Sequence, residues 1–144
     1  MFLLDTNVVS ELRKAKAGRA DKNVVAWAAG AAASSMFVSA ITVQELEIGV
    51  LLAERRDPAQ GMILRRWLEA QVLPAFAERI LSVDTAVARR SATLHVPDPR
   101  PVRDSLIAAT ALVHGMPVVT RNGADFAPSG VEVIDPWRPL DEGA

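Results

Sequence analysis

The sequence has no cysteine, only two histidines and only three lysines among its 144 residues. Without cysteine the chain can form neither disulfides nor thiolate zinc sites, and it cannot use a thiol as a nucleophile. His95 and His114 do not share a metal-ligand spacing, and no serine lies in a His–Asp pattern. The glycines do not show a phosphate-loop spacing. These absences exclude the common cysteine, serine-triad and P-loop active sites.

An excess of positive charge is also missing, because 16 basic and 17 acidic residues give a net charge of −1. A protein that coats nucleic acid through bulk charge would be far more basic, so any nucleic-acid contact must come from a local patch. No apolar run reaches the length of a membrane span, and the first residues lack a signal-peptide pattern. We expect a cytoplasmic protein without membrane contact.

Half of the residues are hydrophobic, which suffices for a core in one domain spanning residues 1–144. Short apolar runs predict the strands, and the first has no polar alternation, as in a strand buried on both faces of a parallel sheet. The predicted strands are Met1–Leu4, Met36–Ser39, Ile80–Val83, Val118–Thr120 and Val131–Ile134. Strands that alternate with helices indicate an α/β architecture with a mainly parallel sheet.

Helical spacing and stop signals predict six helices, at Val8–Lys14, Asn23–Gly30, Ala40–Arg56, Ala59–Val72, Asp84–His95 and Val102–His114. The third and fourth are expected to form a helical hairpin around Asp57-Pro58. Asp84 is a predicted N-cap, and Gly115 is a predicted helix stop. Thr42 and Glu45 fit the capping-box pattern. The segment 121–130 is expected to be a loop.

Acidic residues follow the predicted strand ends, which is where ligands bind in open α/β sheets. Asp5 ends the first strand, and Glu45 lies in the first turn of the helix after the second. Asp125 follows the fourth strand. Asp104 begins a helix antiparallel to the sheet, so it starts near the same edge. We therefore expect four carboxylates, distant in sequence, to converge at the carboxyl edge of the sheet.

Converging carboxylates repel one another, and a hard divalent cation that prefers oxygen ligands is the common compensation. Such a site suits phosphodiester hydrolysis, because a metal can lower the pKa of the attacking water and a second can stabilise the leaving oxygen. The hydroxyls of Thr6 and Thr120 and the amides of Asn7 and Asn122 are predicted to orient water or phosphate oxygens.

Each acid also has an ordinary structural explanation. Asp5 could close an Asx turn, and Glu45 could be only the acidic half of a capping box. Asp104 could complement a helix dipole, and Asp125 could be a turn or N-cap residue. Glu47 is another possible ligand, but it lies about 200° around the helix from Glu45. Only one of these two is expected to face the site.

Four segments together resemble PIN-domain ribonucleases of the VapC toxin type, and in particular the FitB-like branch. Phe2–Glu11 is similar to the first strand and acidic turn of that family, and Val38–Leu46 resembles its second motif. Arg103–Ala111 looks like the third motif. Thr120–Phe126 is similar to the Thr-Arg-Asn-x-x-Asp-Phe element. A lone Asp-Thr-Asn would be a weak signal, whereas four motifs in order cover nearly the whole chain.

The resemblance implies a three-layer α/β/α fold with a mainly parallel sheet of four to five strands. It implies that Asp5, Glu45, Asp104 and Asp125 form an acidic quartet that binds Mg²⁺ or Mn²⁺ and cleaves RNA. It also implies a homodimer and a small VapB-like antitoxin that blocks the site, with a higher hetero-oligomer on DNA as a further assembly. The helical hairpin corresponds to the family's variable region and is not diagnostic.

Basic residues cluster soon after the Asp5 turn, at Arg13, Lys14, Lys16 and Arg19, and Arg121 adjoins the fourth motif. As a functional patch they would contact RNA phosphates beside the metal site. As a structural feature they would form a solvated helix end, and Arg121 would bridge surface acids. Trp27, Trp67 and Trp137 are expected in the core or at an interface rather than in base stacking.

Two other functions are compatible with parts of the pattern. In a phosphoaspartyl receiver or phosphatase, Asp5 would be phosphorylated. Such sites need a lysine at a later strand end, yet all lysines here are early in the chain, and position 7 is Asn where such phosphatases use a second Asp. A non-catalytic interaction module would keep the fold without cleaving RNA. The complete quartet favours the ribonuclease.

Overall fold

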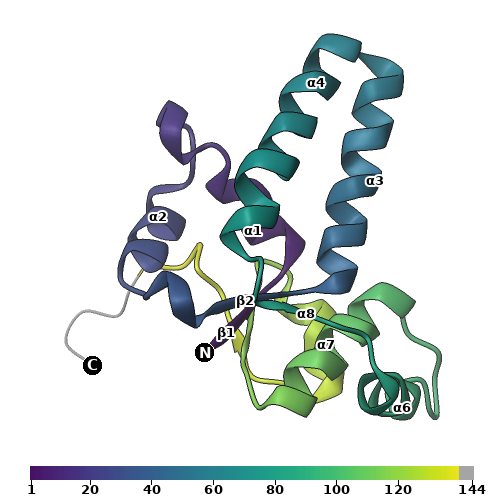
Figure 1. The fold of residues 1–144 in the computed structure, drawn as a ribbon. Coiled ribbons are helices and arrows are strands. Elements are labelled where there is room, and N and C mark those ends of the chain that lie inside the picture. The colour runs from purple at the N-terminus through teal and green to yellow at the C-terminus, as the bar shows by residue number, and fades with distance from the viewer. Residues whose placement is uncertain (140–144) are drawn as a thin grey trace.

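The computed structural model describes residues 1–139 as a parallel sheet with helices on both faces (Figure 1). The sheet has the order β3-β2-β1-β4-β5, and every neighbouring pair is parallel. The strands are β1 (Phe2–Leu4), β2 (Met36–Ser39), β3 (Ile80–Leu81), β4 (Val118–Val119) and β5 (Val133–Ile134). The five predicted strands are therefore confirmed: β2 has the predicted bounds, and the other four are shorter than predicted.

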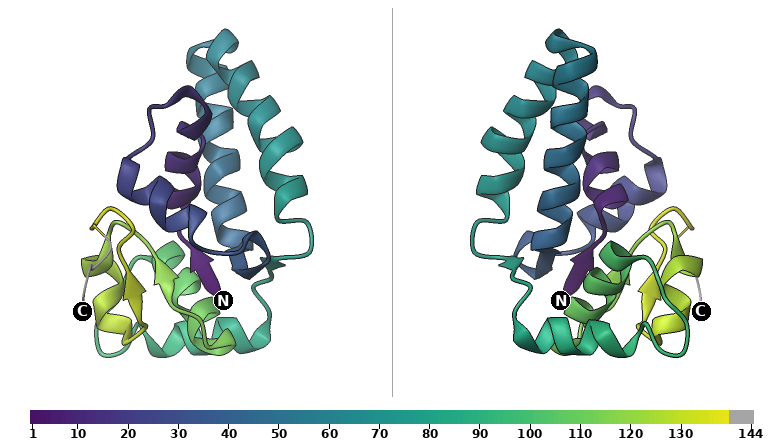
Figure 2. Two further views of the ribbon diagram at one scale, coloured as in Figure 1. Left: turned by 90° about the vertical axis from the view of Figure 1, so that its left-hand side faces the viewer. Right: turned by 90° about the vertical axis from the view of Figure 1, so that its right-hand side faces the viewer.

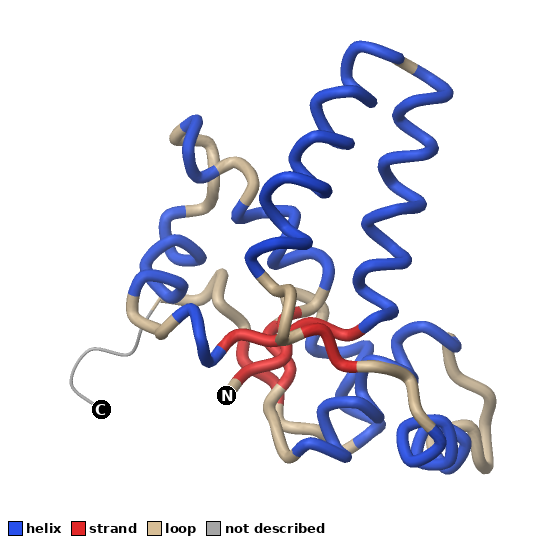
Figure 3. Tube along the Cα trace, in the orientation of Figure 1, coloured by secondary structure: helices blue, strands red, loops and turns tan. Residues whose placement is uncertain are grey.

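Within residues 1–139, the six predicted helices are present in order and approximate position, together with two further short α-helices. They are α1 (Thr6–Leu12), α2 (Lys22–Ala29), α3 (Ala40–Arg56), α4 (Pro58–Trp67), α5 (Leu73–Ala75), α6 (Thr85–Thr93), α7 (Val102–His114) and α8 (Gly123–Phe126). Figure 3 shows the strands at the centre with helices around them. Within residues 1–139, no helix combines the length and the apolar character needed to cross a membrane.

Alternating side chains of the central strands supply two separate cores, as the two-residue period of a strand requires. Leu4 of β1 and Val119 of β4 lie in the core under α1, α3 and α4, whereas Leu3 and Val118 lie in the core under α7 and α8. Register is consistent with this, since Leu3 pairs with Val118 and Leu4 with Val119. Two cores on one sheet make the expected three-layer α/β/α fold, seen from the sides in Figure 2.

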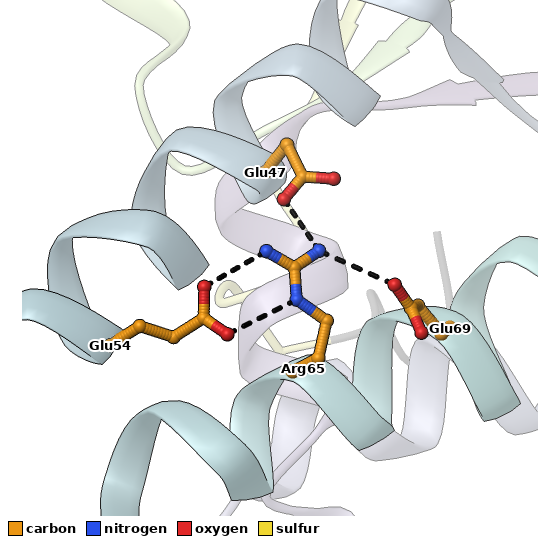
Figure 4. Close-up of polar contacts among 4 residues, drawn as sticks. All are labelled: Glu47, Glu54, Arg65 and Glu69. Carbon is orange, nitrogen blue, oxygen red and sulfur yellow. Dashed lines mark hydrogen bonds and ion pairs between the residues drawn. The ribbon is translucent and has the colours of Figure 1, made fainter. Parts of the chain in front are cut away.

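The α3–α4 hairpin projects beyond the sheet and is held by an ion-pair network (Figures 1 and 4). Arg65 of α4 pairs with Glu47 at 2.6 Å and with Glu54 at 3.0 Å, both on α3, and with Glu69 at 3.5 Å. Gly61 lies against the backbone of Glu54, so the two helices touch where no side chain intervenes. Glu47 therefore serves the hairpin.

Two predicted helix ends are confirmed and two predicted segments were wrong. Asp84 caps α6 by accepting from Val87 N at 2.9 Å, and Gly115 ends α7 with a left-handed φ of 67°. The predicted fourth helix changes at Leu68–Val72 into a π-helix before α5, so it is not one regular helix to residue 72. The predicted loop 121–130 contains α8, whose four residues are too few for a periodic signal.

Candidate active site

Asp5 lies directly after β1, at the N-cap of α1, and is only 6% exposed. Its Oδ1 accepts from the backbone N–H of Thr6 at 2.8 Å, which explains why α1 begins at residue 6 rather than at the predicted residue 8. Its Oδ2 accepts from the hydroxyl of Thr120 at 2.8 Å and from the Asn7 amide at 3.4 Å. The carboxylate is thus fixed from two neighbouring strand ends.

Thr120 connects the residues predicted to support the site. Its buried hydroxyl donates to Asp5 and accepts from the Asn7 amide at 3.2 Å and from the backbone N–H of Asn122 at 3.0 Å. The side-chain oxygen Oδ1 of Asn7 accepts in turn from the backbone N–H of Arg121 at 3.3 Å. These contacts hold the segment after β4 against the segment after β1.

Glu45 reaches the same place from α3. Its Oε1 accepts from the hydroxyl of Thr6 at 2.6 Å, and its Oε2 lies 3.8 Å from Nε of Arg103. The predicted capping box of Thr42 and Glu45 was wrong. Ser39 caps α3 instead, so Thr42 is a fully buried residue of the helix and Glu45 is one turn further along.

Asp104 lies in the first turn of α7 and completes an open cleft of about 460 Å³ that Asp5 and Glu45 also line. Asp125 lies on α8, is exposed, and does not line this cleft. It shares with Asp104 a small neighbouring cavity of about 20 Å³. Three of the four predicted acids therefore line one cleft, and Asp104 lies between them and Asp125.

The pKa values of two carboxyls report their surroundings. Burial raises the pKa of Asp5 above its usual value, although the hydrogen bonds from Thr120 and Thr6 oppose this. Burial also raises the pKa of Asp104, and the negative charges of Asp5, Asp125 and Glu45 add to the effect. Among the described residues neither Asp5 nor Asp104 has an ion-pair partner. Within residues 1–139, the two aspartates at the cleft therefore carry negative charge that no direct ion pair offsets.

This donor set fits a hard divalent cation, since all its ligand atoms are oxygens and the uncompensated carboxylates repel one another. Within residues 1–139, no three acidic or histidine side chains are arranged tightly enough to hold a metal as they stand. Asp5 is fixed by its hydrogen bonds, Glu45 accepts from Thr6, and Asp125 is exposed.

The predicted basic cluster divides between two places. Lys14 lines the acidic cleft, where it pairs with Glu11 at 3.0 Å, and Arg121 lines the same cleft. Arg13 and Lys16 line a separate, mostly apolar pocket of about 160 Å³, in which Arg13 lies over the ring of Trp67. The exposed Arg19 lines neither the acidic cleft nor this pocket.

Sequence reasoning missed four side chains at the cleft, namely Ser10, Glu11, Arg103 and Trp137. Arg103 pairs with Glu45, while Ser10, Glu11 and Trp137 line the cleft. Arg103 could have been found from its position beside Asp104, and Glu11 from its place one turn after the Asp5 segment. Trp137 had no such signal, because only the pairing of β4 with β5 brings the tail beside the cleft.

Comparison with known proteins gives one consistent relationship. Residues 2–127 match the PIN domain family. The chain is 40% identical to the VapC ribonuclease Y4jK of Sinorhizobium fredii over 96% of this chain and 99% of that protein. The crystal structure of FitAcB from Neisseria gonorrhoeae superposes with a TM-score of 0.85 at 37% identity, covering 95% of this chain and 99% of that one.

A toxin–antitoxin complex from Klebsiella pneumoniae is also similar, with a TM-score of 0.64 and 25% identity over 97% of this chain and 100% of that one. The relationship extends along nearly the full chain, and the match to the PIN domain includes β1, Glu45, Asp104 and α8. This chain belongs to the PIN-domain family.

Proposed function

We propose that this chain is a divalent-metal-dependent endoribonuclease that acts as the toxin of a toxin–antitoxin pair. The observation that carries the proposal is the open cleft lined by Asp5, Glu45 and Asp104, in which neither aspartate has an ion-pair partner among the described residues. A cleft with this charge has little affinity for phosphate by itself. It becomes suited to a phosphodiester once a cation is present.

Asp5, Glu45, Asp104 and Asp125 are the residues that would hold Mg²⁺ or Mn²⁺. When bound, such an ion supplies a water of lowered pKa and offsets the charge that develops on the phosphate. The protein's own part is positioning. Thr120 and the start of α1 fix the Asp5 carboxylate before substrate arrives, which avoids reorganisation during the reaction.

The basic groups at the cleft are suited to the RNA backbone. Lys14 and Arg121 line the cleft, and the exposed Arg103 directly precedes Asp104 in the first turn of α7. These are the local positive charges that a chain of net charge −1 needs in order to hold an anionic polymer. Arg13, Lys16 and Arg19 would make contact only with RNA that extends beyond the cleft.

The proposed partners follow from the family. A related structure is described as a toxin–antitoxin complex, and a relative of 40% identity is named a VapC ribonuclease. We infer that this chain is held inactive by a small VapB-like antitoxin. We further infer that it forms a homodimer and joins the antitoxin in a larger assembly on DNA.

The phosphoaspartyl alternative has little support at Asp5. Asp5 is 6% exposed, and the three lysines of the chain, at positions 14, 16 and 22, all precede β2, so no later strand end supplies the lysine that such a site needs to neutralise a phosphoryl group. A non-catalytic module is the remaining alternative, and the following experiment distinguishes it.

The purified protein is incubated with a fluorescently labelled single-stranded RNA in Mg²⁺ or Mn²⁺, with and without EDTA. We expect cleavage that EDTA abolishes and that Asp104→Asn lowers by more than about 100-fold, since even residues that only support metal ligands contribute about 10–100-fold. Asp98→Asn is the matched control, because Asp98 is exposed in the loop before α7. Equal cleavage by native and Asp104→Asn protein in EDTA contradicts the proposal. No cleavage by native protein with either metal supports the non-catalytic module.

A further inference from the structure

Arg121 and Trp137 form a stacked pair at the side of the acidic cleft. Arg121 follows Thr120 at the end of β4, and Trp137 lies three residues after Ile134 at the end of β5. Because β4 and β5 are parallel neighbours, their carboxyl ends bring the two residues together. The guanidinium carbon lies 5.2 Å from the centre of a Trp137 ring, and both residues line the cleft with Asp5 and Asp104.

Backbone hydrogen bonds fix the position of Trp137. The backbone N–H of Trp137 donates to Asp135 Oδ1 at 2.9 Å, and the backbone carbonyl of Trp137 accepts from the side-chain amide of Asn23 at 2.8 Å. The half-buried ring packs against the core that contains Leu4. The indole is therefore a rigid support for whatever lies over it.

Arg121 is held at its backbone but not at its charged end. Its N–H donates to Asn7, whereas its exposed side chain has no carboxylate within 4 Å among the described residues. An arginine that only bridged surface acids, as one prediction allowed, would show such a carboxylate. Within residues 1–139, the guanidinium of Arg121 lies on an aromatic ring beside the cleft, and its side-chain N–H groups have no protein acceptor.

The geometry points to a nucleobase subsite: an unpaired base of single-stranded RNA stacks on the Arg121 guanidinium, which Trp137 supports from below. This inference rests on the proposed ribonuclease function and adds how the substrate is held. Unstacked RNA bases are bound on arginine planes and aromatic rings, and such stacking tolerates many sequences because every base has a π-face. The base would belong to a nucleotide next to the phosphate in the cleft, which would favour single-stranded RNA over a duplex.

A simple phosphate contact by Arg121 is the competing explanation, and it makes a different prediction. A phosphate contact does not depend on the base, so Arg121→Lys would weaken the binding of every RNA by the same factor, whether or not a base is missing. Stacking depends on the guanidinium plane and on the base, so the loss in Arg121→Lys would disappear when the stacked base is absent, although the charge is kept. Arg121→Lys therefore distinguishes the two explanations when intact and abasic RNAs are compared.

The experiment measures binding of fluorescein-labelled RNA hexanucleotides in Mg²⁺ by anisotropy, with Asp104→Asn as the common background to prevent cleavage. One RNA is intact, and each of the others carries one abasic position. We expect Arg121→Lys to weaken binding of the intact RNA by roughly 5–150-fold, the range of one lost base stack. At one abasic position, the two proteins should then bind nearly alike. The salt dependence should be unchanged, because the charge is kept.

Two further variants test the support and the background. Trp137→Phe should retain most of the binding and Trp137→Leu should lose much of it, with thermal melts verifying that both fold. Arg138→Lys is the matched control on the same tail, since Arg138 is 84% exposed and pairs with Asp135 outside the cleft. It should bind every RNA as the background protein does.

The results separate failure of this inference from failure of the proposed function. If the protein with native Asp104 cleaves RNA but Arg121→Lys binds intact and abasic RNA as the background protein does, the stacking subsite is wrong and the ribonuclease stands. If the affinity lost in Arg121→Lys is the same for every abasic RNA, Arg121 contacts phosphate only, which also overturns the subsite. If the native protein neither cleaves nor binds RNA, both proposals fail.

Discussion

Replacing Thr120 by valine tests how the structure holds Asp5. The Thr120 side chain is fully buried, and its hydroxyl donates to Asp5 and accepts from the Asn7 amide and the Asn122 N–H. Valine has nearly the same shape but can make none of these hydrogen bonds. The substitution therefore removes one charge-assisted bond and leaves two donors without their acceptor, with little change in packing.

The expected loss is about 2–3 kcal/mol in the free energy of unfolding at neutral pH. A hydrogen bond to a charged group contributes about 1.5–3 kcal/mol, and Asp5 is too buried for water to replace it fully. For a chain of this size that corresponds to a fall of roughly 5–10 °C in Tm. In the same variant we expect weaker Mg²⁺ binding, because the Asp5 carboxylate is no longer fixed.

The pH dependence gives a second, independent test. Burial raises the pKa of Asp5 in the folded state, so ionised Asp5 weakens the fold at neutral pH and stability is recovered as the pH falls through that folded pKa. The Thr120 hydrogen bond lowers this pKa, so its loss raises the pKa further. The deficit of Thr120→Val should be complete above both folded pKa values. It should shrink on acidification as the Asp5 carboxylate is protonated, and its charge-dependent part should vanish below about 3.8.

Urea unfolding in chelator-containing buffer at several pH values measures this deficit. Thr110→Val is the matched control, because Thr110 is also fully buried and its hydroxyl bonds only to the Leu106 carbonyl within α7, at 2.7 Å. Its cost should be about 1 kcal/mol or less and independent of pH. If the two variants lose equal stability, or if the Thr120→Val deficit does not change with pH, the account of Asp5 is refuted.

Two other predictions concern stability away from that bond. Gly61→Ala should destabilise the protein by about 1–3 kcal/mol in thermal or urea unfolding, because its new Cβ would lie 2.7 Å from the backbone N of Glu54 on α3. Gly49→Ala, in the same hairpin with nothing within 4 Å, should stabilise by up to about 1 kcal/mol, and the reverse order would contradict the packing. Burial and neighbouring acids raise the pKa of Asp104, so its charge destabilises the metal-free protein at pH 7. Asp104→Asn should therefore raise the free energy of unfolding by less than about 1 kcal/mol after solvent screening, which corresponds to a Tm higher by a few degrees. Calorimetry should show this gain disappearing toward pH 4, where Asp104 becomes protonated. Mg²⁺ should stabilise only the native protein. A variant that melts below the native protein at pH 7 would contradict repulsion between Asp104 and its acidic neighbours.

Local patterns predicted the fold because the elements here are locally encoded. The apolar run before Asp5 is buried on both faces, as its lack of alternation indicated. Asp84 caps the start of α6 through its own side chain, and Gly115 ends α7 through its left-handed conformation. The errors occur where tertiary contacts decide. The π-helix begins at Leu68, a fully buried residue, so packing rather than propensity sets the geometry there.

The sequence predicted that the acidic residues converge at the carboxyl edge of the sheet, but it did not predict their hydrogen-bond partners. Parallel topology placed Asp5 and Thr120 at the same edge of the sheet, and the strand order, which makes β1 and β4 neighbours, brings them into contact. The partner of Glu45 was predicted to be three residues away, and in the structure it is Thr6, 39 residues away. A capping pattern considers only residues within one helical turn. It therefore cannot predict that the distant Thr6 hydroxyl donates a 2.6 Å hydrogen bond to Glu45.

Asp5 shows why a structural and a functional explanation of one residue need not compete. Its Oδ1 caps α1 through Thr6, and its Oδ2 is held by Thr120 beside the cleft. The helix cap is therefore what orients the carboxylate, and the same burial that makes the cap rigid raises the pKa of Asp5 and makes its charge costly. Asparagine would serve equally well as a cap. The presence of a costly charge where a neutral amide would suffice is thus an argument for a cation at this edge of the sheet.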